Sequence, residues 1–73
     1  MAGIKTANVI GLGLIGGSVA AGLKARGWAV CGSDQNPAHE SEALSRGIID
    51  STGLDPAAAI TFVATPVKAI AAG

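Results

Sequence analysis

Two segments with different hydrophobic periodicity open the chain. Residues 5–10 end in consecutive apolar side chains, which predicts a short strand of a parallel sheet. From Leu14 to Arg26 the apolar side chains recur at every fourth position, which predicts a helix whose apolar stripe consists of Ile15, Val19 and Leu23. Gly16 and Ala20 lie beside this stripe, and their small size would let the helix sit close to the sheet.

A second strand and a second helix follow. Gly27 is placed to end the first helix, and Trp28 to Ser33 form a short run of apolar and small residues that predicts a strand. Asn36-Pro37 is typical of a helix start, because asparagine caps the first turn and proline fits its first position. We expect Gly47 to end this helix, whose apolar face is thin.

The last third of the chain contains one clear strand signal. Ile48 to Asp50 predicts a very short edge strand, Ser51 to Gly53 a turn, and Asp55-Pro56 a capped helical turn. Ile60 to Ala64 has the β-branched and aromatic content of a buried strand, and Val67 to Ala72 predicts the opening of a further helix. Strands that alternate with helices are typical of a parallel α/β sheet.

The composition is consistent with one small folded core. Hydrophobic residues make up 49% of the 73 residues and charged residues 14%, with zero net charge, which argues against a disordered tail. The chain has no basic excess and almost no aromatic residues, so nucleic-acid binding has no support. Cys31 is the single cysteine, and no Cys/His cluster has the spacing of metal ligands. We expect a cytoplasmic protein without a metal.

The N-terminal run from Thr6 to Leu23 has an alternative interpretation. It carries no charge and follows Lys5, which resembles a signal peptide or a short membrane span. Gly13 and Gly17 also have the GxxxG spacing of packed membrane helices. Five glycines interrupt the run, however, and each costs roughly 1 kcal/mol inside a helix. The glycines therefore favour a strand, a turn and a shorter helix.

Gly11, Gly13 and Gly16 follow the first predicted strand with the spacing GxGxxG. In a dinucleotide-binding turn the first glycine permits the tight turn, the second lets a pyrophosphate approach, and the third lets the helix pack on the strand. Backbone N–H groups around Leu14 and Ile15 would then face the phosphates. The pattern predicts an α/β fold with a Rossmann-like parallel sheet and helices on both faces. At 73 residues, the chain would be the N-terminal portion of such a domain.

Asp34 increases the specificity of the glycine pattern. It ends the second predicted strand, 18 residues after Gly16, where a dinucleotide fold places the carboxylate that binds the adenosine ribose. A carboxylate at this position would repel a 2′-phosphate and so favours NAD over NADP. The alternative is that Asp34 only caps the turn before Asn36-Pro37, and the preceding strand and glycine turn favour the ribose role.

Other residues with reactive side chains have simpler structural explanations. Cys31 is expected in the core, and Ser18 near the start of the helix has no base beside it. His39 lies on a polar segment with no carboxylate arranged around it, which predicts a solvated surface histidine. Thr65 follows a strand whose carboxyl end should face the ligand, so it either lines the cofactor site or only ends the strand.

Four strings of residues follow the order of a known family. They are Val9-Ile10-Gly11-Leu12-Gly13-Leu14-Ile15-Gly16-Gly17-Ser18, Gly32-Ser33-Asp34, Arg46-Gly47-Ile48-Ile49-Asp50 and Ala64-Thr65-Pro66-Val67. In these strings the chain resembles the opening of prephenate dehydrogenase and its arogenate-using relatives. The resemblance covers nearly the whole chain, and its first string is much more specific than glycine spacing alone.

The resemblance implies an NAD-dependent oxidoreductase of tyrosine biosynthesis that oxidatively decarboxylates prephenate or arogenate. The residues that it assigns to cofactor binding are Gly11, Gly13, Leu14, Ile15 and Gly16 for the pyrophosphate, Asp34 for the ribose, and Thr65. In such enzymes a later histidine assists the reaction, and a helical domain provides substrate contacts and dimerisation. We therefore expect residues 1–73 to be the N-terminal part of the cofactor domain, inactive alone, within a full-length homodimer.

One departure and two alternatives accompany this resemblance. Family members often have an acidic residue just before the last strand, where this chain has Ala59-Ile60-Thr61-Phe62-Val63. A 3-hydroxyacid dehydrogenase or a pyrroline carboxylate reductase shares the opening fold, although Leu14-Ile15 replaces the methionine common in hydroxyacid enzymes. A non-catalytic module that senses a dinucleotide is also compatible with residues 1–73.

Overall fold

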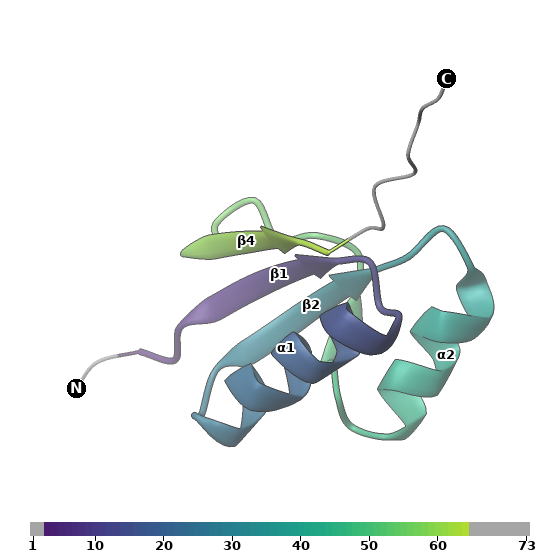
Figure 1. Cartoon of the computed structure of the whole chain (residues 1–73). Helices are drawn as coiled ribbons and strands as arrows, with labels where there is room; N and C mark the ends of the chain where they lie inside the picture. Colours follow the sequence, from purple (N-terminus) through teal and green to yellow (C-terminus); the bar gives the residue numbers. More distant parts are fainter. Residues whose placement is uncertain (1–2, 65–73) are drawn as a thin grey trace.

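The computed structural model describes residues 3–64, which form a four-stranded parallel sheet and two helices (Figure 1). In chain order the elements are β1 (Thr6–Ile10), α1 (Leu14–Ala25), β2 (Ala29–Ser33), α2 (Pro37–Ser45), β3 (Ser51–Thr52) and β4 (Ile60–Val63). The strand order is β3-β2-β1-β4, with each neighbouring pair parallel. The chain therefore builds outward from β1 to β3 and then crosses to the other side of β1, which is the topology of a doubly wound sheet.

Both helices end in the same way, at the glycines predicted to stop them. Gly27 and Gly47 have φ angles of 88° and 72°, a backbone region that glycine enters without steric cost. After α1, the Trp28 N–H donates to the Leu23 carbonyl, and after α2 the Ile48 N–H donates to the Ala43 carbonyl. This six-to-one hydrogen bond is the Schellman arrangement, and it turns the chain back toward the next strand.

The core lies between the sheet and the two helices, which Figure 1 shows on the same face of β1 and β2. Its buried members are Val9, Leu12, Ala20, Val30, Ala43 and Ile49, with Val19, Leu23, Trp28 and Ile48 packed against them. The expected stripe is wrong at Ile15, whose side chain is 70% exposed. Gly16 and Ala20 are buried in its place, because α1 approaches the sheet too closely for a large side chain on that line.

The last strand forms where predicted, but its expected burial is wrong. β4 pairs with β1 in register, yet Ile60 and Val63 are exposed and Phe62 is only half-buried. Within residues 3–64, β4 is the edge of the sheet, and the helices pack on β1, β2 and β3. An apolar composition therefore identified the strand but not its exposure within residues 3–64.

The edge strand on the other side of the sheet is displaced from its predicted position. Ser51–Thr52, expected as a turn, forms β3, while Ile48 to Asp50 precede it. Ile49 is buried in the core, and the Asp50 N–H donates to the Val30 carbonyl at 2.8 Å. Because the Ile49 side chain packs under the sheet, the strand begins three residues later than predicted. The local composition does not reveal this shift.

A polar residue inside β1 anchors the long connection between β3 and β4. Asn8 is only 5% exposed; its amide nitrogen donates to the Asp55 carbonyl and the Thr61 hydroxyl, and its oxygen accepts from the Asp55 N–H. The predicted turn at Asp55-Pro56 is present, since the Asp55 carboxylate accepts from the Ala57 N–H at 2.9 Å, but it does not extend into a helix. Asn8 therefore joins the centre of the sheet to this loop.

The uncharged N-terminal run is divided as the glycines predicted. It forms β1, the glycine turn and the 12-residue helix α1. Among residues 3–64, no helix has both the length and the apolarity that a membrane crossing requires. The predicted helical opening at Val67 to Ala72 and the candidate residue Thr65 lie outside the described residues.

Candidate functional site

The parallel register brings three loop starts to one end of the sheet. Ile10 at the end of β1 is paired with Ser33 of β2 on one side and with Val63 of β4 on the other. The hydrogen bonds continue one residue further, since Gly11 donates to the Ser33 carbonyl and Ala64 donates to the Ile10 carbonyl. The glycine turn and Asp34 are consequently neighbours in space, linked by the hydrogen bond from the Leu12 N–H to Asp34 Oδ2. The glycine turn follows β1, next to the point between β1 and β4 where the strand order reverses.

The glycine turn is a tight structure that only glycine permits at two positions. Gly11 has a φ angle of 95°, which lets the chain leave β1 sharply. A Cβ atom at Gly16 would lie 1.6 Å from the Gly11 carbonyl oxygen, so α1 rests directly on the turn. These are the steric roles that the spacing predicted for the first and third glycines.

Gly13 differs from these two glycines because its Cα faces open space. No heavy atom of another residue lies within 4 Å of a Cβ built there, and its φ angle of −73° is available to any residue. Gly13 precedes α1 and provides no side-chain cap, and the first turn of this helix contains no acidic residue. The first helical hydrogen bond runs from the Gly17 N–H to the Gly13 carbonyl. The N–H groups of residues 14–16 therefore have no hydrogen-bond partner within α1. They lie at the N-terminal end of the helix, where the helix dipole is positive.

Asp34 connects the end of β2 to the glycine turn. Its Oδ2 accepts from the Leu12 N–H at 2.6 Å, and its Oδ1 accepts from the Asn36 N–H at 2.8 Å. Its own N–H donates to Glu40 Oε2 at 3.0 Å. The Asp34 side chain is 11% exposed, so the carboxylate is held in one orientation and still borders the groove. Because a carboxylate has about four acceptor positions, it retains capacity for a further donor.

The same hydrogen bonds keep Asp34 ionised. Donation from the N–H groups of Asn36 and Leu12 lowers the pKa of the Asp34 carboxyl from its ordinary value, against the opposing effect of burial. Contact with His39 lowers this pKa further. The site therefore presents a negative charge at neutral pH, which suits hydroxyl donors and disfavours a phosphate.

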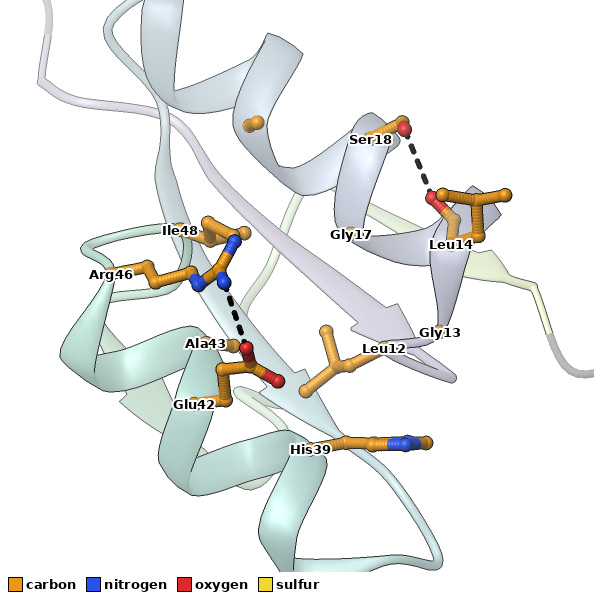
Figure 2. Close-up of a pocket in the computed structure, with 11 residues that line it drawn as sticks. Leu12, Gly13, Leu14, Gly17, Ser18, His39, Glu42, Ala43, Arg46 and Ile48 are labelled. Atoms are coloured by element: carbon orange, nitrogen blue, oxygen red, sulfur yellow. Dashed lines mark hydrogen bonds and ion pairs between the residues drawn. The ribbon is translucent and has the colours of Figure 1, made fainter.

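The prediction that no carboxylate accompanies His39 is wrong. His39 is exposed as expected, at 44% of its side chain, but its Nδ1 lies 3.2 Å from Asp34 Oδ1. Figure 2 shows it projecting from the start of α2 beside Leu12, while the Glu42 and Arg46 pair lies further along the same helix. The two residues are brought together because the Asn36 cap folds the chain back immediately after Asp34. The sequence of α2 by itself does not reveal this contact.

These groups line one open groove of about 1000 Å³. Its lining residues are Ile10, Gly11, Gly13, Leu14, Ile15, Ser33, Asp34, Gln35, Asn36, His39 and Ala64. Of the predicted cofactor residues, the structure thus brings Gly11, Gly13, Leu14, Ile15 and Asp34 together, with Gly16 packed beneath the turn. Ala64, adjacent to Thr65, lies in the same groove.

The other reactive side chains lie apart from this groove. Ser18 is exposed, and its hydroxyl donates to the Leu14 carbonyl at 2.9 Å within α1. Cys31 is half-buried, with its sulfur 3.3 Å from the Ser51 hydroxyl. Among residues 3–64 no group of three or more His, Cys, Asp or Glu side chains is arranged to hold a metal ion.

Gly32 is a structural support of the site that the glycine pattern did not reveal. A Cβ atom there would lie 2.8 Å from Ile49 and 3.0 Å from Leu12, so a larger residue would push against the turn that carries the Asp34 contact. In the sequence, only its place in the string Gly32-Ser33-Asp34 indicated that Gly32 belongs to the site. The packing explains it, because Gly32 lies beside Val9 in the sheet, with the side chains of Ile49 and Leu12 directly over it.

The strand order, the glycine turn beneath α1 and the acidic residue after β2 define a Rossmann-like α/β fold. Solved structures with this fold include Synechocystis arogenate dehydrogenase, which matches with a TM-score of 0.77 and 35% sequence identity over 84% of this chain. Prephenate dehydrogenase from A. aeolicus, in complex with hydroxyphenyl propionate and NAD⁺, matches with a TM-score of 0.63 and 32% identity over 74% of this chain. The resemblance predicted from the four strings is thus confirmed.

The two matches differ greatly from this chain in length. The matched region covers 23% of the Synechocystis protein and 20% of the A. aeolicus protein. No family model matches the chain, and no curated protein matches it. The similarity therefore concerns about a fifth of the length of each of those enzymes.

Proposed function

We propose that this chain is the NAD-binding part of a dehydrogenase of the prephenate or arogenate type. The observation that carries the proposal is a single groove in which the uncapped start of α1 and the ionised Asp34 face the same space. The proposal is also supported by the similarity of this chain to an arogenate dehydrogenase and to a prephenate dehydrogenase crystallised with NAD⁺. In such enzymes NAD accepts a hydride while the substrate loses carbon dioxide.

Two parts of the groove with opposite charge would bind different parts of NAD. The N–H groups at the start of α1 would bind the pyrophosphate, with the open Cα of Gly13 permitting close approach. Asp34 would accept hydrogen bonds from the adenosine ribose through the acceptor positions left free by Leu12 and Asn36. Gly16 keeps α1 against the turn so that both groups face one ligand.

Substitution of Gly13 tests the pyrophosphate assignment without disturbing the fold. A Cβ atom at Gly13 meets no heavy atom within 4 Å apart from its chain neighbours, and the φ angle of −73° is open to any residue. We therefore expect Gly13→Val to fold, at the modest cost of an unfavourable N-cap residue. The branched side chain would occupy the approach of the pyrophosphate, and we expect NAD affinity to fall roughly 100-fold or more by calorimetry.

Gly22→Ala provides the matched control. Gly22 is also on α1 and also faces open space, but it does not line the groove. We expect this variant to bind NAD like the unsubstituted chain. Full NAD affinity in Gly13→Val, with an intact circular dichroism spectrum, would contradict the proposed position of the pyrophosphate.

A second test concerns the choice between NAD and NADP. We expect the unsubstituted chain to bind NAD more tightly, and Asp34→Asn to reduce that preference by roughly tenfold because the repelling charge is removed. Glu42→Gln removes one negative charge from α2 at a residue that does not line the groove of Asp34, and it should leave the preference unchanged. Equal affinity of the unsubstituted chain for both cofactors would refute the ribose role of Asp34.

The remaining parts of the proposal concern the full-length enzyme. We expect it to act on prephenate or arogenate as a cytoplasmic homodimer, as the resemblance implies. Residues 1–73 alone should show no dehydrogenase activity, because the later histidine and the helical domain that the resemblance implies are not among them. Turnover of prephenate by these residues alone would refute the expectation that they bind the cofactor without catalysing the reaction.

A further inference from the structure

His39 is the one titratable group of the cofactor groove to which the proposed function assigns no role. Its Nδ1 lies 3.2 Å from Asp34 Oδ1, on the carboxylate expected to bind the ribose. Its side chain is 44% exposed and lines the same groove as the glycine turn. The ring is thus positioned both to contact Asp34 and to meet a ligand bound beside it.

The charge on this ring changes what Asp34 presents to a ligand. With a neutral ring, the pair carries the single negative charge of the carboxylate, which opposes a 2′-phosphate. With a protonated ring, the pair is neutral overall and offers a second N–H to an anion. Histidine is the side-chain type that ordinarily changes charge between about pH 5 and pH 8.

We propose that His39 is a specificity-determining residue of the adenosine-ribose site, and that its protonation reduces the discrimination against a 2′-phosphate that Asp34 imposes. The inference rests on the proposed function, since it requires a dinucleotide in this groove. It assigns to the chain a preference for NAD over NADP that weakens as the pH falls.

The charged groups near His39 lie just before α2, on α2 and at its C-cap. Glu40 accepts from the Asp34 N–H, and Glu42 and Arg46 pair with each other at 3.0 Å further along the helix. The facing start of α1, residues 14–17, carries no charged side chain. Asp34 is therefore the charge nearest to the ring among the groups that face it. Arg46, the C-cap residue of α2, lines a neighbouring pocket with His39 but does not line the cofactor groove.

The test compares dissociation constants of NAD and NADP for the unsubstituted chain and for His39→Gln, between about pH 8 and about pH 5.5, the range in which histidine titrates. Glutamine keeps a neutral donor toward Asp34 but cannot carry a charge. The 2′-phosphate itself gains a proton at about pH 6, so some loss of preference is expected in both proteins. The quantity that tests His39 is the difference between the two pH profiles.

We expect both proteins to have the same NAD preference at the alkaline end. At the acidic end the unsubstituted chain should discriminate against NADP less than His39→Gln by roughly fivefold, the effect of one nearby charge in a solvated groove. Arg46→Gln removes a cation from the same helix and should follow the unsubstituted profile. Identical profiles for the unsubstituted chain and His39→Gln, with NAD bound normally, would overturn the role of His39. Failure of the unsubstituted chain to bind NAD would instead overturn the proposed function.

Discussion

The closest backbone approach in the site is the contact of α1 with the glycine turn, and Gly16→Ala tests it directly. A Cβ atom at this position would lie 1.6 Å from the Gly11 carbonyl oxygen and 2.7 Å from the Gly11 carbonyl carbon. Real Cβ contacts are not shorter than 3.0 Å, so the helix and the turn must separate by about 1.4 Å, the difference between these distances. Both partners are backbone, and no side-chain rotation relieves the overlap.

The magnitude follows from two opposing effects. Alanine in place of glycine favours a helix by about 1 kcal/mol. Overpacking against an unyielding neighbour costs about 3 kcal/mol, the upper end of the usual range. We therefore expect Gly16→Ala to lower the free energy of unfolding by about 2 kcal/mol, a large part of the stability of a small domain.

Gly22→Ala isolates the packing effect from helix propensity. It makes the same chemical change in the same helix, but apart from the adjacent residues and backbone of α1 itself, no heavy atom lies within 4 Å of the added methyl group. We expect this variant to be more stable than the unsubstituted chain by about 0.5–1 kcal/mol. Urea titration followed by circular dichroism measures both variants. If Gly16→Ala proved as stable as Gly22→Ala, α1 would not rest on the turn as described.

Two further predictions concern groups that hold the sheet together. Asn8→Ala should lower the free energy of unfolding by about 2–3 kcal/mol in the same urea assay, because it removes three partly buried hydrogen bonds to Asp55 and Thr61; an unchanged midpoint would show that water replaces the asparagine. The Lys24 ammonium group, followed by the Val30 N–H, lowers the pKa of the Asp50 carboxyl in the folded state. This carboxylate therefore stabilises the fold above about pH 5, and its contribution is lost as the pH falls through the lowered pKa. The stability deficit of Asp50→Asn at neutral pH should accordingly shrink as the pH falls below the ordinary range of an aspartate and vanish once the carboxyl of the unsubstituted chain is protonated. A deficit independent of pH would contradict this.

Much of the fold was predictable because its signals are local. Asn36-Pro37 starts α2, and Gly27 and Gly47 end the two helices through positive φ angles that the residue type itself permits. The spacing of Gly11, Gly13 and Gly16 indicated the turn, and the structure supplies the steric reason for the first and third of them. Each of these signals acts within a few residues of its own position in the chain.

Other features depended on partners far away in the sequence. Ile15 continues the apolar stripe of α1 but is exposed, because the distance between the helix and the turn is set by Gly11 and Gly16. The β-branched content of β4 indicated a strand but not its position at the sheet edge within residues 3–64, which follows from pairing with β1 alone. Burial is a property of what covers a residue, and composition along one segment does not contain that information.

In the candidate site, too, some features follow from the local sequence and others only from the tertiary structure. By itself the sequence determined that a glycine turn follows a strand, that Asp34 ends the next strand, and that the chain resembles prephenate and arogenate dehydrogenases. Only the tertiary structure decided that the Asp34 carboxylate accepts from the Leu12 N–H and lies 3.2 Å from His39. These contacts arise because parallel pairing of β1 and β2 aligns their ends and the Asn36 cap reverses the chain. Hydrogen bonds between groups 22 residues apart depend on that alignment, which no local pattern encodes.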